Sequence, residues 1–582
     1  RNFHYYLCRQ LKGGGMEINM KQQVKVAIIW PPLCERFGYY RFGPRISIMS
    51  LGYLASYVES IENCFIEQIN IDKLIHMETD IWREMDLGGM LLENKCIEEY
   101  MEGIQIKESD LYDQAYSYLI NLKDWSQYDM VAVSYDLNYL KDRYAPAFYR
   151  FLSEISKKYG VKISFGGLGF PSIEILKLFK RFPFIDYLQF GNIDSVNLES
   201  FKSIILHLFD PERSNDDLIN VYYRKKHGIG VKFFKEKVKA STEKKFIICP
   251  KYNMKDNSIF RTRYKEFYQF DKGFTTEDQN DNIEIPVIPY RFSVGCINHC
   301  AFCMSSADGK IFAYKSAEEV VDDIERLMEE NDSKYFMFLN SMINFSIKYL
   351  DELHSIMMRR NVKIMFTDSA EFHGMSKDVL CMLKEMGAIG LWFGLECPSD
   401  RILHYIHKNC TVAEAEEVLK ITDSLGIWNG VNLIAGLPHE RDEDIDKTVD
   451  FIKCNWPFVN MWQVTPFYLV RSKFLETPEK YDIKIINRYA TVDKGEGDML
   501  MATFDEIGGL KWDEKQRKTA ESFKLFLDTI DKYAQVPNIS NTTFLFYAYE
   551  KFNGNKDLIK NWLIKNYSGK APEIKVTGLR RD

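Results

Sequence analysis

The chain has 582 residues, of which 46% are hydrophobic and 27% charged, and its net charge is −7. This length and hydrophobic content are enough for several domains with cores of their own. The negative balance argues against a general affinity for nucleic acid. No apolar stretch reaches the roughly 18 to 20 residues that cross a bilayer. We therefore expect neither a membrane nor a nucleic acid as a partner.

Twelve cysteines and the absence of a secretory signal pattern predict a protein of the cytoplasm, where thiols stay reduced or bind metal. The chain opens with "RNFHYYLCRQLKGGG", and Met16 follows directly. We interpret residues 1–15 as a non-native leader or a mis-assigned start. They are left out of the fold prediction.

From residue 24, short apolar strands alternate with amphipathic helices. This alternation predicts a doubly wound, Rossmann-like parallel sheet over residues 16–209. The strands are expected at 24–29, 64–69, 130–133, 161–165 and 186–190, and the helices at 46–60, 144–159, 172–181 and 195–208.

Residues 210–282 interrupt this rhythm and are interpreted as a linker or small subdomain. They are polar, rich in Lys and Asp, and contain a predicted hairpin around Gly228 and Gly230. The basic stretch 222–245 is interpreted as a solvated face rather than a nucleic-acid patch.

A second alternation of strands and helices occupies residues 283–472. Six β/α units are too few to close an eight-stranded barrel, so we predict a partial (β/α)6 barrel that is open on one side. The tail, residues 473–582, is expected to be helical and aromatic. The barrel strands are expected at 287–294, 335–339, 362–367, 389–393, 430–435 and 459–465.

Helix starts in the barrel carry clear local signals. Ser316 with Glu319, and Thr411 with Glu414, have the spacing of capping boxes. Ser376 is a predicted N-cap.

Three cysteines, Cys296, Cys300 and Cys303, follow the first barrel strand in the stretch "CINHCAFC". Ligands of α/β proteins bind at the carboxyl ends of strands. A structural zinc site needs four ligands, and the nearby His299 would crowd a single tetrahedral site. Three thiolates can instead hold a four-iron cluster with one iron open to a ligand. A non-catalytic zinc protein remains the alternative from another class.

This Cys-x3-Cys-x2-Cys loop resembles that of the radical S-adenosylmethionine (SAM) superfamily. The stretches "FLNSMINFS" (338–346), "FGLECPSDRILHYIHKNCTVAEAEEVL" (393–419) and "GVNLIAGLPHERDEDI" (430–445) carry the same resemblance. It implies a [4Fe–4S] cluster on the three cysteines, SAM on the open iron, and reductive cleavage of SAM to a 5′-deoxyadenosyl radical. An electron donor such as flavodoxin or ferredoxin is then a required partner.

The resemblance also implies a SAM site, with no catalytic side chain assigned beyond the cluster. In this sequence Asn432 stands where the family often has Gly. Taken singly, Glu396 could instead be a charge paired with Arg401. Trp392 and Trp462 could line a pocket or belong to a core. The implied SAM-binding residues are Phe302, Asn340, Glu396, Asn432, Ile434 and Gly436.

The first sheet resembles the cobalamin (B12)-binding domain of class B radical SAM enzymes. "VKVAIIWPP" (24–32), "YDMVAVSY" (128–135), "VKISFGGLGFPS" (161–172) and "FIDYLQFGN" (184–192) carry this resemblance. It implies cobalamin at the strand ends, near Ser134, Gly166 and Gly167. The Asp-x-His-x-x-Gly signature of many cobalamin proteins is absent after the first strand, which reads "PPLCERFG".

Together these resemblances imply a cobalamin-dependent C-methyltransferase that acts on a peptide or small natural product. One alternative is a cobalamin-independent radical SAM cyclase or epimerase. Another is a methylthiotransferase with a second cluster on Cys34, Cys64 and Cys96.

Overall fold

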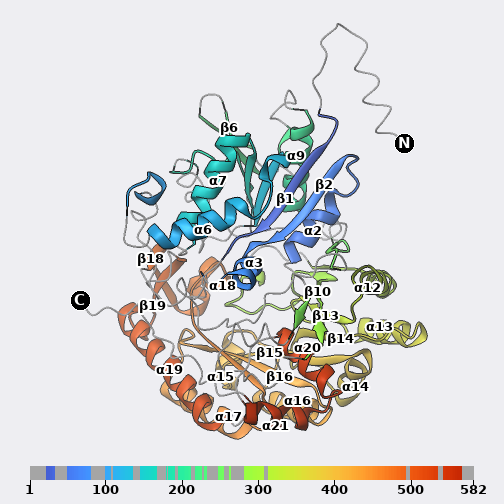
Figure 1. Cartoon of the computed structure of the whole chain (residues 1–582). Coiled ribbons are helices and arrows are strands. Elements are labelled where there is room, and N and C mark those ends of the chain that lie inside the picture. The colour runs from blue at the N-terminus through green and yellow to red at the C-terminus, as the bar shows by residue number, and fades with distance from the viewer. Residues whose placement is uncertain are drawn as a thin grey trace.

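The structure is a computed structural model of the whole chain (Figure 1). It describes residues 21–32, 49–79, 81, 99–105, 109–134, 144–166, 179, 181–189, 194–210, 217–225, 228–232, 247–254, 261–263, 281–306, 312–492, 499–534, 536 and 542–566.

The N-terminal part is a seven-stranded sheet with the strand order β2-β1-β3-β4-β5-β6-β7. The first five strands of this order run parallel, and the last two form an antiparallel hairpin. The order 2-1-3-4-5 is that of a doubly wound sheet whose topological switch point lies between β1 and β3. The strands are β1 (Val24–Trp30), β2 (Cys64–Asn70), β3 (Met130–Ser134), β4 (Lys162–Gly166), β5 (Tyr187–Gln189), β6 (Val221–Arg224) and β7 (Ile229–Lys232).

Helices cover both faces of this sheet, as predicted for a doubly wound fold. Alternate residues of β1 enter different cores: Val26 and Ile28 pack against α2 and α9, whereas Ala27 and Ile29 pack toward α3, α6 and α7. Burial on both faces explains why β1 reads as a continuous apolar run. The helices are α2 (Met49–Val58), α3 (Ile71–Glu78), α6 (Ser109–Asn121), α7 (Ala145–Tyr159) and α9 (Asp194–Phe209).

The predicted hairpin near Gly228 exists, but it is not part of a separate linker. Its strands β6 and β7 extend the N-terminal sheet at the β5 edge. The sheet therefore continues beyond residue 209, where the sequence pattern ended it. The predicted helix 172–181 and the leader 1–15 lie outside the described residues.

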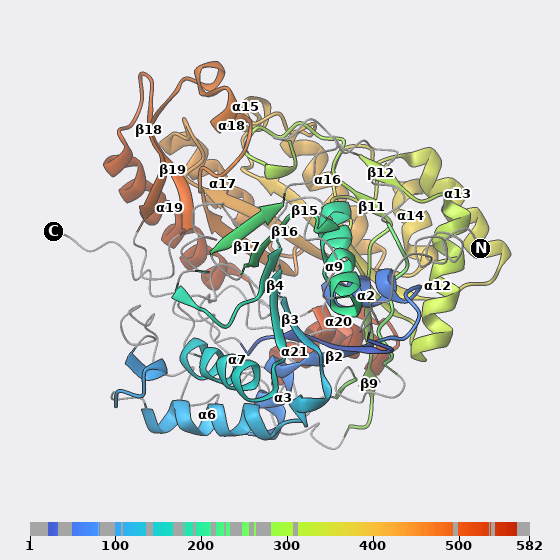
Figure 2. The same cartoon turned by 90° about the horizontal axis from the view of Figure 1, so that it is seen from above.

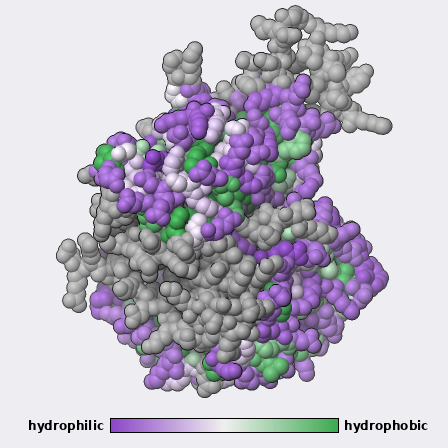
Figure 3. All heavy atoms as spheres, viewed as in Figure 1, coloured by the Kyte–Doolittle hydropathy of each residue, from purple (hydrophilic) through white to green (hydrophobic). Residues whose placement is uncertain are grey.

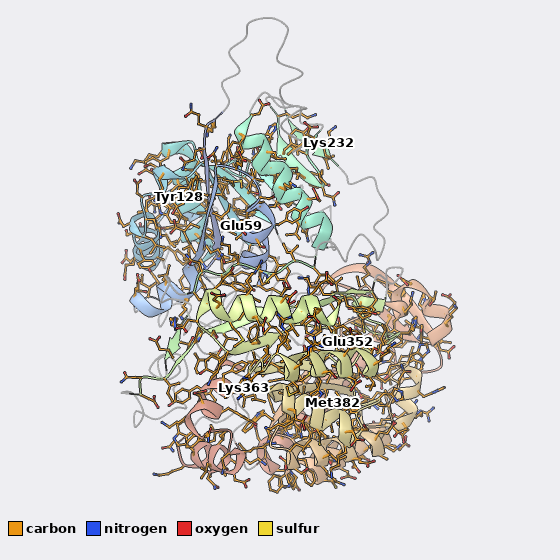
Figure 4. All side chains as sticks on the ribbon, turned by 90° about the vertical axis from the view of Figure 1, so that its right-hand side faces the viewer. Glu59, Tyr128, Lys232, Glu352, Lys363 and Met382 are labelled. Atoms are coloured by element: carbon orange, nitrogen blue, oxygen red, sulfur yellow. The ribbon has the colours of Figure 1, made fainter. Side chains whose placement is uncertain are left out.

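The second part is a six-stranded parallel sheet in sequential order, β10-β13-β14-β15-β16-β17, as predicted for a partial barrel. Its strands are β10 (Val287–Tyr290), β13 (Tyr335–Phe338), β14 (Met365–Ala370), β15 (Ala388–Glu396), β16 (Trp428–Ala435) and β17 (Met461–Pro466). The helices between them are α12 (Ala317–Asn331), α13 (Ile347–Arg359), α14 (Lys377–Met386), α15 (Asp400–Tyr405), α16 (Val412–Ser424) and α17 (Asp442–Asn455). Glu352 and Met382, on α13 and α14, mark this outer layer in Figure 4, whereas Glu59, Tyr128 and Lys232 mark the N-terminal part.

The predicted helix caps of the barrel are confirmed. Ser316 with Glu319 and Thr411 with Glu414 form complete capping boxes at the starts of α12 and α16. The Ser376 hydroxyl accepts the Val379 N–H at the start of α14. These signals could be identified in the sequence because each cap joins residues three positions apart.

The tail is not purely helical, as the sequence pattern suggested. It begins with an antiparallel hairpin, β18 (Ile483–Val492) and β19 (Met499–Glu506). Three helices follow: α19 (Trp512–Tyr533), α20 (Thr542–Lys551) and α21 (Lys556–Asn566). Helix α19 packs along β17, the last barrel strand, and along α17. Helix α20 packs under the amino ends of the barrel strands, against Val287, Tyr335 and Trp428.

A short segment, residues 247–254, joins the two parts. Its Tyr252 ring occupies the space over Gly52 of α2, where an added Cβ would collide with it. The Tyr252 hydroxyl donates to the Pro289 carbonyl of β10 at 2.6 Å. The Tyr53 hydroxyl of α2 donates to the Arg291 carbonyl at 2.9 Å. Helix α2 is thereby fixed against the strand that leads to the three cysteines.

Figure 2 gives a second view of the two sheets and their helices. Described residues on the face drawn in Figure 3 are mainly hydrophilic, with scattered hydrophobic patches. Among the described helices, none combines the length and the apolar character needed to span a membrane.

Candidate active site

The three cysteines lie in the loop that follows β10, at the carboxyl ends of the barrel strands. Cys300 is buried, and Cys296 and Cys303 are partly exposed. The loop is tied to the barrel at its centre, because the Ala301 N–H donates to the Ile406 carbonyl at 2.9 Å. Burial raises the pKa of the Cys300 thiol to about 12, although Lys408 acts in the opposite direction.

Asn340, a predicted SAM contact, holds the start of this loop. Its amide oxygen accepts the N–H groups of Phe292 and Ser293, at 3.2 and 3.0 Å, and also the Ser293 hydroxyl. Its amide nitrogen donates to Asp368 at 2.7 Å. Asn340 is buried and both ends of its side chain are used within the protein. The geometry therefore gives it a positioning role and does not support a direct contact with SAM.

Glu396 lies at the end of β15 and is part of a buried charged group. The Lys408 ammonium lies 4.0 Å from Glu396 and 2.7 Å from Glu371, and the Lys408 side chain is only 2% exposed. The alternative pairing of Glu396 with Arg401 is wrong, because Arg401 pairs with Asp444 on α17. Lys408 and Glu371 were not predicted as site residues.

The backbone makes room for this group. Glu396 has a φ of +68°, which is uncommon for a residue other than glycine. A Cβ at Gly394 would lie 2.5 Å from the Glu396 carboxylate and 3.3 Å from the Lys408 ammonium. The register of β15 with β16 also shifts between Gly394 and Glu396. These features turn the carboxylate back over the end of its own strand.

Two largely buried carboxylates and one buried ammonium lie together here. Burial raises the pKa of Glu396 to about 7, with a further increase from Glu371 and an opposing effect of Lys408. The two carboxylates raise the pKa of Lys408 above its ordinary value despite its burial. Lys408 thus stays charged and can hold the negative charge of both neighbours.

The side of the barrel sheet that faces its interior, here called the inner face, is partly exposed near the carboxyl ends. On β15 to β17, exposure alternates with burial. The intervening side chains, such as Leu391, Val431 and Val464, are buried in the main core. The partly exposed inner positions are Trp392, Gly394, Glu396, Asn432, Ile434, Gln463 and Thr465.

The other predicted SAM residues have mixed surroundings. Asn432 and Ile434 lie on the inner face, and Phe302 and Ile434 pack against one apolar cluster. Gly436 has a φ of +83°, and a Cβ there would collide with Thr519 of α19. Helix packing therefore already accounts for glycine at this position. Trp462 belongs to the outer core, where it contacts Phe451.

At the N-terminal sheet, Ser134 and Gly166 end neighbouring strands and are in register. The Ser134 hydroxyl lies 3.2 Å from that of Ser50 in α2. The Gln189 side chain lies beside Gly166 and donates to Ser164. Gly167 lies outside the described residues. This part of the strand edge is formed by small or neutral hydrogen-bonding groups.

Three cysteines, Cys34, Cys64 and Cys96, were considered for a second cluster. Of these, only Cys64, in β2, lies among the described residues. In the described part of the chain, no three His, Cys, Asp or Glu side chains converge on a point that could hold a single metal ion. A cluster makes a different demand, because its thiolates bind separate irons.

The comparison with protein families decides the nature of the barrel. Residues 290–452, which include the three cysteines and strands β13 to β16, match the model of the Radical SAM superfamily. The barrel is a radical SAM domain. The resemblance predicted from the cysteine loop is thereby confirmed.

Curated relatives match part of this chain over part of their own length. An uncharacterized methyltransferase of Pyrococcus horikoshii is 28% identical over 162 residues, which are 28% of this chain and 35% of the relative. The anaerobic magnesium-protoporphyrin IX monomethyl ester cyclase of Rubrivivax gelatinosus is 21% identical over 228 residues, 37% of this chain and 40% of the relative. The chain thus covers well under half the length of these relatives.

Two solved structures align with nearly the whole of this chain. The radical SAM methyltransferase TsrM from Kitasatospora setae, with cobalamin and a [4Fe–4S] cluster bound, aligns with a TM-score of 0.53 and 13% identity over 94% of this chain and all of that one. The cobalamin-dependent radical enzyme OxsB aligns with a TM-score of 0.53 and 14% identity over 93% of this chain and 72% of that one. At these identities the likeness shows the fold, and the predicted α/β fold is confirmed.

Proposed function

We propose that this protein is a radical SAM enzyme and a cobalamin-dependent C-methyltransferase of a peptide or small natural product. One observation carries the proposal: three cysteines with Cys-x3-Cys-x2-Cys spacing stand at the carboxyl end of the first strand of a radical SAM domain. In this proposal Cys296, Cys300 and Cys303 hold a [4Fe–4S] cluster.

The donor set fits such a cluster. Three thiols lie in one loop, and bound iron would hold each as a thiolate even where burial favours the thiol. The loop is fixed by the Ala301–Ile406 bond and by Asn340. When bound together, the cluster and SAM supply a 5′-deoxyadenosyl radical that abstracts hydrogen from the substrate, with the electron coming from a donor such as flavodoxin or ferredoxin.

The charged group beside the loop would bind and orient SAM. Lys408 neutralises part of the charge of Glu371 and Glu396 and holds both carboxylates in place. Glu396, on the inner face, is the carboxylate that would accept hydrogen bonds from SAM. Because the group is already buried and ordered, little reorganisation would accompany binding.

The edge of the N-terminal sheet would hold cobalamin. Ser134 and Gly166 end strands beside the switch point, where open α/β sheets bind their ligands. The neighbouring Ser164 and Gln189 are buried and hydrogen-bond to each other, so the strand ends here present small, neutral groups that suit a large and mostly neutral corrin. When bound, cobalamin supplies the methyl group; the chain's contribution is to hold it against the radical SAM domain through α2.

The cyclase relatives favour a second candidate reaction, ring formation on a small-molecule substrate. Product analysis separates the two reactions, because methylation adds one carbon to the substrate whereas ring formation adds none.

The first test is the cobalt-to-iron ratio of protein purified without oxygen from cells supplied with cobalamin. About four irons and one cobalt per chain would support both cofactor sites and direct the product search to methylated compounds. Iron without cobalt would make the sheet a scaffold and favour cyclised or epimerised products. Stoichiometric zinc without acid-labile sulfide would refute the radical SAM assignment.

A further inference from the structure

The inner face carries a second feature, which lies deeper in the barrel than the charged group. Trp392 of β15 lies flat across two glycines of neighbouring strands. A Cβ at Gly390 would lie 2.8 Å from the six-membered ring of Trp392, and a Cβ at Gly430 would lie 2.7 Å from its five-membered ring. The two glycines thus create the space that the indole fills.

This indole forms a floor inside the barrel. On the amino-terminal side, Leu545 of α20 approaches Gly390, and Trp392 packs against the apolar cluster formed with α20. Toward the carboxyl ends the same inner face becomes partly exposed. Trp392 therefore separates a filled lower layer from an accessible upper layer.

Two side-chain amides lie directly above this floor. Side chains alternate along a strand, so Asn432, two residues beyond Gly430, shares the side on which Trp392 lies. Asn432 of β16 is in register with Gln463 of β17 and with Gly394 of β15. The three positions make one row across the inner face, next to the Glu396 carboxylate that folds over Gly394.

Asn432 lacks a hydrogen bond that its position demands. Its amide oxygen is fully buried, yet no donor reaches it from the described residues. The Gln463 side chain likewise has no hydrogen-bond partner among the described residues, although its backbone lies in the β16–β17 pairing. A buried carbonyl oxygen without a donor is costly, and in native proteins such an atom usually meets a ligand or water.

The row is also neutral. At the inner positions of β15 to β17 below Glu396, the side chains are Trp392, Trp428, Asn432, Met461 and Gln463, without a charge among them. A charged substrate group placed there would be desolvated without compensation. An aromatic floor beneath an unpaired acceptor instead suits a flat, neutral group that carries an N–H donor.

From this arrangement we propose that Trp392, Asn432 and Gln463 form the substrate-binding wall. They would recognise a planar neutral group with an N–H donor, as in an amide or a nitrogen heterocycle. In this proposal the Asn432 amide turns its covered oxygen toward the substrate and accepts the N–H. Gln463 can pair with a second polar atom, and Trp392 stacks against the plane. The inference deepens the proposed function and rests on it for the reaction, but not for binding.

The test uses two probes of equal shape, indole and benzofuran, which differ in the N–H donor. Binding to the full-length protein, loaded with iron and SAM, is measured by ligand-detected magnetic resonance. We expect indole to bind roughly tenfold more tightly than benzofuran, because one neutral hydrogen bond changes the affinity by about that factor. Asn432→Leu should abolish this preference, and Trp392→Ala should weaken both probes. Gln114→Leu, which likewise replaces a side-chain amide by Leu but at an exposed position of α6, should alter the affinity for neither probe.

The outcomes separate the inference from the proposed function. Equal affinity for both probes in a protein that cleaves SAM would overturn the substrate wall and leave the enzyme assignment intact. If Asn432→Leu weakens SAM while the indole preference persists, Asn432 is a SAM residue and the inference is wrong. If the protein prefers indole over benzofuran but does not cleave SAM, the substrate-binding wall is supported and the proposed function is wrong.

Discussion

The barrel and the N-terminal sheet both present the carboxyl ends of parallel strands, but the side chains at those ends differ in charge. In the barrel, Glu371, Glu396 and Lys408 lie buried side by side. In the central strands of the N-terminal sheet, the corresponding places hold Ser134, Gly166 and other neutral groups. The two sets of strand ends therefore suit different ligands: a compact charged molecule at the barrel, and a large, mostly neutral one at the edge of the N-terminal sheet.

The two sheets also differ in where a ligand can enter. Helices cover both faces of the N-terminal sheet, so a ligand has access only at its edge. The barrel buries its outer face under helices and leaves its inner face partly exposed. Under the proposed function, substrate would lie inside the barrel and the sheet would bring a second reagent to its open end.

Replacing any one of Cys296, Cys300 and Cys303 by Ala should produce the largest effect. We expect loss of the cluster and of 5′-deoxyadenosine release, because two thiolates cannot hold the cubane. Cobalt content should persist, since the sheet has its own core. Iron, cobalt and product are measured on the same sample, with Cys454→Ala as the control for an exposed cysteine. If a variant of any of these three cysteines still releases 5′-deoxyadenosine at the wild-type rate, the assignment of the cluster to them is wrong.

Much of the fold that frames these sites could be predicted from sequence, because its signals are local. The capping boxes at Ser316 and Thr411 each involve residues three apart. The alternation of apolar strands and amphipathic helices likewise lies within short windows. The cysteine loop spans only eight residues, so the resemblance to the family could be seen there, with support from the three stretches within 338–445.

The features that were missed depend on contacts between distant segments. Lys408 meets Glu371 across 37 positions, and Gly436 accommodates Thr519 of a helix in the tail. The hairpin β18–β19 mixes polar and apolar residues, as in "IKIINRYATV", so its alternation was obscured. Hairpin β6–β7 showed a turn signal, but the sequence does not reveal that it pairs with β5.

A bulky substitution at the strand ends of the N-terminal sheet is a second test of the difference between the two sheets. Ser134→Phe places a bulky ring where a corrin would approach the strand ends. We expect cobalt content to fall roughly tenfold, as for other steric overpacking, with iron and SAM cleavage retained. Ser126→Phe, an exposed position of the same part of the chain, is the matched control. Unchanged cobalt content would mean that cobalamin, if bound, does not use this edge.

Glu396→Gln tests the charged end of the barrel with a smaller effect. The substitution keeps the shape but removes a carboxylate acceptor, so SAM affinity should fall roughly tenfold or more. Iron content should remain, because Glu396 lies on another strand from the cysteine loop. Equilibrium binding of SAM is measured beside Glu417→Gln, an exposed glutamate of α16. Equal SAM affinity in the variant and the wild type would remove Glu396 from the site.

Glu440 lies in the loop between β16 and α17. We expect it to make the free energy of unfolding of the barrel and its tail depend on pH. One carboxylate oxygen accepts the Gly436 N–H at 2.8 Å, and the other is buried with no partner among the described residues. Burial raises the pKa of Glu440 from 4.5 to about 7, although Lys515 and the Gly436 N–H oppose this. The folded state therefore binds this proton more tightly than the unfolded chain.

The sign of the effect follows from that difference in proton binding. The contribution of Glu440 is fully present below about pH 4.5, falls as the pH rises, and is lost above about pH 7, with a size on the order of 1–3 kcal/mol. Glu440→Gln cannot ionise, so its thermal unfolding midpoint should exceed that of the wild type at pH 8 and match it more closely at pH 5. Glu443→Gln, exposed on α17, should show no such difference between the two pH values. A Glu440→Gln variant that is less stable at pH 8 than at pH 5, relative to the wild type, would show that the carboxylate is ionised and stabilising in the fold. Lys515, which pairs with Glu506 at 2.8 Å, would then have to hold both carboxylates, as Lys408 does at the neighbouring strand end.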